Sequence, residues 1–220
     1  MKVLVSAFFC LAALTFSVIG SLLGEPARAK TLSALAPDVV RYRIDASKST
    51  FMVHADRAGL AWFKGHSHRI AVRDFSGEAS LSLDVLNPAS LELTVDAKSL
   101  EETDPAFTDQ QKGIIKKEIN ELVLETSKYP EITFKSTDVK GSMKNGAFDV
   151  KIGGDLTLHG VTKHIDIPAR VTLNGDTLRA VGELDVNRKK FGVNATSAFH
   201  GFVKIRHTIK FEFDIICTRI

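Results

Sequence analysis

Residues 209–214 read Ile-Lys-Phe-Glu-Phe-Asp, an unbroken alternation of apolar and charged side chains. The alternation continues on both sides of this stretch, over residues 204–217. Its apolar side also includes Ile205, His207, Ile215 and Cys217. Successive side chains of a β-strand point to opposite faces, so the pattern predicts a strand with one buried and one solvated face. Such half-solvated strands are typical of antiparallel sheets.

The same period of two recurs in earlier segments, at residues 49–56, 75–85 and 91–97. Later strands are separated by turn sequences, which are Asn145-Gly146, residues 159–163 and residues 174–176. Asn-Gly is a strong hairpin signal because both residues tolerate a positive φ. The strands expected between these turns are residues 132–140, 147–158, 164–173 and 177–186.

Residues 109–125 break the alternation. Ile115, Ile119 and Leu122 follow helical spacing there, with Lys and Glu between them, and Pro105 and Pro130 flank the segment. About eight strands and one inserted helix predict an all-β fold, a lipocalin-like antiparallel β-barrel closed on itself. A two-sheet sandwich is the structural alternative.

The N-terminus has the composition of a signal peptide. Lys2 precedes an apolar run to Leu23, and Ala27-Arg28-Ala29 suits cleavage after Ala29. We therefore expect a signal peptide at 1–29, a flexible lead-in at 30–40 and one barrel domain at 41–220, located in the periplasm or secreted. A retained membrane anchor is the rival interpretation, whereas after cleavage we expect no stable membrane insertion.

The composition narrows the class of protein. The chain has 220 residues, 25% of them charged, and a net charge of +3, which is too small to indicate nucleic-acid binding. Its 14 Phe against 2 Tyr and 1 Trp suit an apolar interior. Of two cysteines only Cys217 would remain after cleavage, and we expect it to be a buried, inert thiol without a disulfide partner.

Residues 154–163, Gly-Asp-Leu-Thr-Leu-His-Gly-Val-Thr-Lys, resemble a characteristic turn of the YceI-like family of lipid- and polyisoprenoid-binding proteins. Weaker matches to the family start at Tyr42, at Tyr129-Pro130 and at Arg188, where the sequence reads Arg-x-x-Phe-Gly. The resemblance spans residues 41–217. It implies an exported barrel that holds a long apolar chain along its axis, and it does not imply catalysis.

We therefore predict a binding protein, not an enzyme, which sequesters an isoprenoid, quinone or lipid-like amphiphile and needs no cofactor. A homodimer is left open by the sequence. The large apolar residues of the inward faces are the candidate ligand-binding residues, although the sequence does not say which face of each strand points inward. They are Phe51, Val53, Phe75, Leu81, Leu91, Leu93, Phe134, Ile209, Phe211 and Phe213.

Two other functions stay open. His66 and His68 have the spacing of two metal ligands on one strand face, with His54, His164 or His200 as a third ligand, which would make a metal-binding or redox-accessory protein. A polar rim is the alternative role for the pair. The other function is a structural or stress protein whose barrel is plugged by its own Phe side chains.

Three further features have two readings each. His159 is expected to hydrogen-bond within its own turn, with headgroup contact as the alternative. His207 is expected to be a satisfied interior histidine, with a role as a ligand as the alternative. The basic run Arg188-Lys189-Lys190 is expected to be a solvated turn, with attraction of an anionic headgroup or a membrane surface as the alternative.

Overall fold

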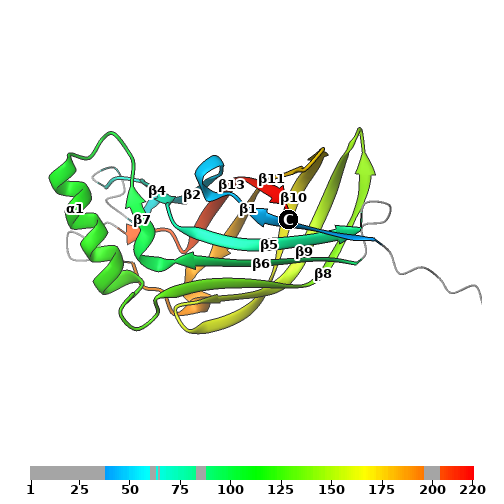
Figure 1. Ribbon diagram of the computed structural model, residues 1–220. Coiled ribbons are helices and arrows are strands. Elements are labelled where there is room, and N and C mark those ends of the chain that lie inside the picture. Colours follow the sequence, from blue (N-terminus) through cyan, green and yellow to red (C-terminus); the bar gives the residue numbers. More distant parts are fainter. Residues whose placement is uncertain (1–37, 60–62, 64, 83–87, 196–203) are drawn as a thin grey trace, which may run out of the picture. The chain divides into compact units, whose positions relative to one another are not determined.

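A computed structural model describes residues 38–59, 63, 65–82, 88–195 and 204–220. Eight strands close into an antiparallel barrel in the order β1-β5-β6-β8-β9-β10-β11-β13, and β13 pairs back with β1 (Figure 1). The predicted barrel is thus confirmed. The strands of this ring are β1 (Val39–Ile44), β5 (Phe75–Ser82), β6 (Ala89–Asp96), β8 (Glu131–Lys144), β9 (Ala147–Leu158), β10 (Val161–Asn174), β11 (Thr177–Asn187) and β13 (Thr208–Arg219).

At one end of the barrel the sheet branches. β13 pairs with β1 through residues 217–219 and with β2 (Thr50–Ala55) through residues 210–214, so β1 and β2 follow one another along the same edge of β13. β2 continues the sheet to β4 (His68–Val72) and β7 (Leu100–Glu102). In the part of the chain described, β7 has no strand on its other side, so the wall between β7 and β8 is not closed by hydrogen bonds at this end.

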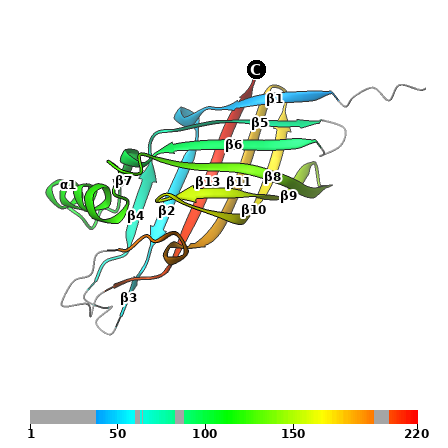
Figure 2. The ribbon, with the colours of Figure 1, turned by 90° about the horizontal axis from the view of Figure 1, so that it is seen from below.

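The helix α1 (Asp109–Glu118) follows β7 directly in the chain and lies beside it in both views (Figure 2). Thr108 caps it with a reciprocal capping box to Gln111, which satisfies backbone groups of the first turn. The Lys116 ammonium lies 2.8 Å from a carboxylate oxygen of Glu101 on β7. The helix is therefore attached to the edge where the barrel wall is incomplete.

A π-helical turn, Ile119–Val123, follows α1, and the backbone N–H of Leu124 donates to the carbonyl of Ile119. The five-residue bond inserts one extra residue into the turn, which shifts the buried face. The predicted apolar face was therefore wrong at its last residue, because Leu122 is 61% exposed whereas Leu124 is buried. Ile119 is buried as predicted.

The predicted hairpin turns between β8 and β9 and between β9 and β10 are confirmed. Asn145 and Gly146 have φ of 51° and 74°, and His159 and Gly160 have φ of 53° and 72°. Two successive positive φ values are those of the tight turn whose twist matches the flanking strands. At Gly160 an added Cβ would lie 2.5 Å from Cε1 of Tyr129, so glycine is needed there for space as well as for conformation.

Shorter elements complete the described chain. They are the 3-10 turns η1 (Ala46–Lys48), η3 (Ala97–Ser99) and η5 (Arg188–Phe191), and the two-stranded pair β3 (Arg57–Ala58) with β12 (Lys204–Ile205). β1 begins at Val39, so residues 39 and 40, which were expected to belong to the lead-in, are strand residues, and Val40 is buried opposite Leu81. The expected signal peptide at 1–29 lies outside the described residues. No helix within the described ranges has the length and apolarity to span a membrane.

Candidate functional site

Three apolar cavities lie in the described barrel, and the smallest shares walls with the other two. The first, of about 160 Å³, lies toward α1, and the second, of about 140 Å³, lies toward the far ends of β8 and β9. Between them is a third of about 80 Å³, which shares Val53 and Phe211 with the first and Phe51 and Leu93 with the second. The cavities therefore follow one another through the interior, and together we call them the tunnel.

Nine of the ten predicted ligand-binding residues line this tunnel. Phe75 is the exception, since it lines none of the three cavities; it is 4% exposed and packs in the core with its ring against that of Phe51. Val53, Ile209 and Phe211 line the first cavity, Phe51, Leu81, Leu91, Leu93 and Phe213 line the second, and Phe134 lines the middle one. The apolar faces proposed from period two are thus the inward faces. That they contact a ligand stays a prediction.

The middle of the tunnel is narrowed by aromatic rings. The centroids of Phe51 and Phe75 are 5.8 Å apart in an edge-to-face contact, and those of Phe51 and Phe211 are 6.2 Å apart. The cavity here has about half the volume of either neighbour. Ligand pockets for drug-sized molecules measure roughly 300–1,000 Å³, so a ligand of that size has to extend through more than one of these cavities.

Polar side chains gather at one end of the tunnel. The first cavity is lined by His68, Glu118 and Arg188 in addition to its apolar residues, whereas the second has only Ser80 and Ser90 as polar lining residues. Ile115 and Ile119 bring the helical segment onto the first cavity. The end near α1 is therefore amphipathic and the opposite end is apolar.

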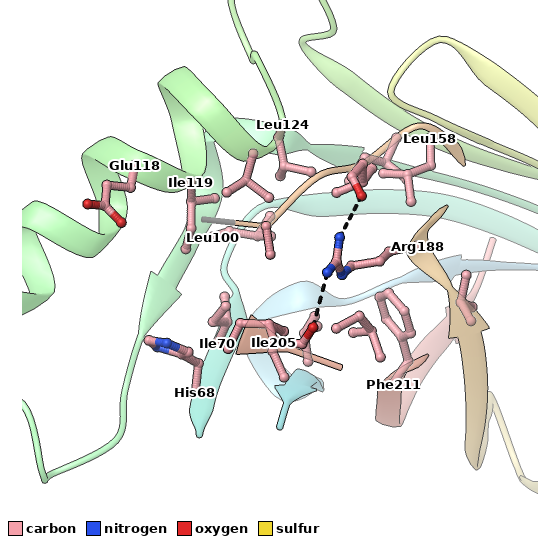
Figure 3. A pocket seen from close by; sticks show the side chains of 18 of the residues that line it. His68, Ile70, Leu100, Glu118, Ile119, Leu124, Leu158, Arg188, Ile205 and Phe211 are labelled. Carbon is pink, nitrogen blue, oxygen red and sulfur yellow. Dashed lines mark hydrogen bonds between the residues drawn. The ribbon is translucent and has the colours of Figure 1, made fainter. Parts of the chain in front are cut away.

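Arg188 is a buried charged residue of this end and is 7% exposed. Its guanidinium donates to the carbonyl oxygens of Arg206 at 3.0 Å, Val193 at 2.8 Å and Ile205 at 3.1 Å. Figure 3 shows the guanidinium within the ring of apolar side chains, its bond to Ile205 among those drawn. Burial lowers the pKa of Arg188. The expectation that this basic run is a solvated turn was wrong for Arg188, whereas Lys189 and Lys190 are exposed.

The turn η5 explains why Arg188 points inward. Asn187 caps it by accepting from the backbone N–H of Lys189, and Gly192 ends it with a φ of 72°. The backbone N–H of Arg188 donates to the carbonyl of His207, and Phe191 beside it is 2% exposed. Both ends of the short turn are thus held against the barrel, which leaves the Arg188 side chain in the interior.

His68 makes a buried contact that the sequence analysis did not predict. Its Nδ1 lies 2.7 Å from Oε2 of Glu102, whose side chain is fully buried and also accepts from the backbone N–H groups of Arg69 and Asp104. The ring of His68 stacks on Phe107, and that of exposed His66 meets the same Phe107 edge-on. These polar and aromatic contacts agree with the polar rim that was the alternative role for His66 and His68, at the end of the tunnel near α1.

The metal hypothesis needed a third ligand beside His66 and His68. His54 lies on β2 with its Nε2 3.2 Å from Glu212, and His164 lies on β10 beside Asp155. His200 lies outside the described residues. Among the residues that are described, no group of three His, Cys, Asp or Glu side chains is placed to hold a metal ion.

Two histidine expectations need correction and one cysteine expectation agrees with the structure. His159 does not bond within its own turn, because its Nε2 lies 2.7 Å from Oε2 of Glu125, at the end of the helical segment. His207 is exposed, since the chain bends between β12 and β13 and takes the residue out of the alternation. Cys217 is 2% exposed, and burial raises the pKa of its thiol to about 11.

Sequence reasoning missed most of the tunnel wall. β9 and β11 contribute Leu156, Leu158, Leu184 and Val186 to the cavities. These residues repeat with period two in strands that had been predicted, so the same signal that selected Phe211 applied to them. No pattern in the sequence indicated that Arg188 is buried, because a basic residue after an Asn is typical of an exposed turn.

A family model described as the YceI-like domain matches residues 42–217. The protein YceI of Escherichia coli O6:H1 is 32% identical over 160 residues, which is 71% of this chain and 74% of that protein.

Two solved structures share the fold. BcnA of Burkholderia cenocepacia has a TM-score of 0.64 at 19% identity, over 80% of this chain and 99% of that one. A polyisoprenoid binding domain from Saccharophagus degradans, implicated in plant cell wall breakdown, has a TM-score of 0.54 at 16% identity, over 81% and 98%. The family model covers most of the chain and nearly all of its barrel, so the chain belongs to the YceI family.

Proposed function

We propose that this protein is an exported carrier that sequesters a long apolar molecule, namely an isoprenoid, a quinone or a fatty-acyl amphiphile, inside its barrel. The observation that carries the proposal is the series of three apolar cavities that share walls along the interior. Its location would be the periplasm or the exterior of the cell, as the N-terminal sequence indicates.

The driving force needs no catalytic group. Burial of one CH₂ is worth about 0.8 kcal/mol, so a long chain that leaves water for the tunnel gains a large free energy from transfer alone. The second cavity is suited to such a chain, because nearly all its lining residues are apolar. The solved Saccharophagus domain described as polyisoprenoid-binding has the same fold, which supports this class of ligand.

The aromatic cluster at Phe51 and Phe211 supports the alternative of a plugged barrel, since these rings narrow the middle of the tunnel. A chain that runs through all three cavities has to pass through the small middle cavity, which both rings line.

Mass spectrometry of an organic extract decides between the two. The protein, purified without detergent, is extracted and the lipid is quantified per mole of folded chain. We expect one long-chain apolar compound at a near-stoichiometric ratio. The carrier proposal is overturned if the extract contains no such compound and the purified protein also fails to take up a C20 or longer isoprenoid alcohol offered in excess.

A further inference from the structure

A basic groove lies on the outside of the barrel, next to the first cavity. It has a volume of about 470 Å³ and is lined by Arg188, Lys189, Lys204, Arg206 and His207, together with small or neutral residues. None of its lining residues is an Asp or Glu. We call these five residues the basic groove.

The basic groove and the tunnel share part of their walls. Arg188, Ala195 and Ile205 line both the groove and the first cavity. Arg188 therefore lies where the outer, charged space meets the inner, apolar one. A ligand with a charged head and an apolar tail could lie across this boundary with each part in its matching environment.

The cations of the groove lack acidic partners in the described part of the chain. No ion pair joins Arg188, Lys189, Lys204 or Arg206 to a carboxylate there, whereas basic residues of the strands are paired, such as Arg179 with Asp214. The adjacent stretch of sequence, residues 196–203, contains no Asp or Glu. The positive charge of the groove is thus not neutralised by the acids described around it.

Arg188 itself has donor capacity left. A guanidinium carries five N–H groups, and three hydrogen bonds to carbonyls account for three of them. A buried charge without a counter-ion is costly, and an anion that binds beside it would offset that cost. Arginine is also suited to planar, multidentate recognition of phosphate and carboxylate groups.

From this juxtaposition we propose that the basic groove is the headgroup subsite of the tunnel and takes a phosphate or carboxylate group of the bound amphiphile. The inference deepens the proposed function and rests on it. It also assigns a direction, with the head at η5 and β12 and the tail toward the second cavity, whose lining is nearly free of polar side chains.

The first test changes the ligand and leaves the protein intact. Farnesyl phosphate and farnesol share one chain and differ in the headgroup, and their dissociation constants are measured by calorimetry. We expect farnesyl phosphate to bind at least tenfold more tightly, with a preference that shrinks as salt is added, because exposed cations are screened. Equal affinities would overturn the subsite and leave the carrier proposal standing. Binding of neither compound would also overturn the subsite, whereas the carrier proposal is decided by the extract and by the uptake of a C20 or longer alcohol.

The second test places the preference in the groove. Lys204→Ala with Arg206→Ala removes two exposed cations and should fold normally, whereas any change at Arg188 would also break three hydrogen bonds to the backbone. We expect this variant to lose most of the preference for farnesyl phosphate with little change for farnesol. Lys140→Ala with Lys144→Ala, on β8 at the opposite end of the barrel, removes the same charge and should keep the preference.

Two further arms separate the sources of an anion. Inorganic phosphate that bound wild-type protein as tightly as farnesyl phosphate does would indicate a site for free anions and overturn the headgroup assignment. In the second arm, phosphatidylglycerol vesicles are sedimented with wild-type protein and with the Lys204/Arg206 variant. If the vesicles carry down only the wild-type protein while the variant keeps its preference for farnesyl phosphate, the groove binds a membrane surface instead. We expect neither result.

Discussion

The rings of Phe51 and Phe211 lie with their centroids 6.2 Å apart and their planes at 52°, and both line the narrow middle of the tunnel. The two residues come from paired strands, β2 and β13, that are far apart in the sequence. A bound chain that passes this point has to contact them. The occupancy of the tunnel should therefore depend on the size and polarity of the side chain at residue 211.

Phe211→Trp is expected to overfill the middle cavity and lower the amount of co-purified lipid per mole of folded protein. Overpacking of this kind costs about 1–3 kcal/mol of folding free energy. Phe211→Asp should lower occupancy further, because an unpaired buried charge disfavours both folding and binding. Lys210 supplies the matched control, since it points outward and pairs with Glu183 at 2.6 Å. The assignment of faces is contradicted if the same two changes at Lys210 remove the lipid and those at Phe211 retain it.

Gly160→Val is expected to lower the free energy of unfolding by about 1–3 kcal/mol, because the positive φ at this residue is strained for a β-branched side chain. The ring of Tyr129 adds a steric cost at the same position. Gly146→Val is the control, since Gly146 has a similar φ of 74° but open space around its Cα. Urea titrations should rank the Gly160 variant as the less stable of the two. Equal midpoints would mean that Tyr129 moves aside without cost.

The Cys217 thiol is expected to resist alkylation in the native protein at pH 8 to 9 and to react once urea is added. Burial keeps its proton in place, with a pKa of about 11, whereas an unfolded cysteine loses its proton near pH 8.5. Between these values the unfolded state binds fewer protons than the folded one, so this group makes stability fall as the pH rises from about 8.5 to about 11. Iodoacetamide labelling followed by intact-mass measurement checks the reactivity. Rapid labelling of the native protein would contradict the burial of Cys217 on β13.

Cleavage after Ala29 is expected when the full chain is expressed in a Gram-negative host. N-terminal sequencing of protein from the periplasmic fraction should then begin at Lys30. Recovery of residues 1–23 in that fraction, or in the membrane fraction alone, would favour the retained anchor. Ala29→Leu should slow processing, because the site requires small residues.

The barrel was predictable because its signals are local. Asn145-Gly146 determines a tight turn by its own conformational preferences, and the alternation around Phe211 determines which side of the strand is buried. Those two kinds of evidence are sufficient for a meander of antiparallel strands. The alternation also placed most of the proposed ligand-binding residues on the tunnel wall, because in a barrel the buried face of each strand is the interior face.

The remaining features depend on an irregular turn or on contacts between distant segments. Leu122 is exposed because one extra residue enters the π-helical turn, which no spacing rule for α-helices detects. Arg188 is buried because carbonyl groups seventeen and eighteen residues later in the chain accept its hydrogen bonds. His207 leaves the predicted alternation because the chain bends there, where Arg206 donates its backbone N–H to Asp56. The last two depend on which segments meet, and that information is not carried by the residue itself.

The position of β13 in the chain affects how the protein can fold. This last strand pairs with β11, β1 and β2, so the ring of hydrogen bonds stays open until residues 208–219 have been synthesised. Until then β1 and β11 each lack a partner on one edge, and such edges promote aggregation in incomplete chains. Closure joins segments more than 160 residues apart in sequence, which makes it a slow step governed by topology. The same pairing sets the two ends of the domain side by side, so a circularly permuted chain opened at Gly146 would retain every strand of the barrel.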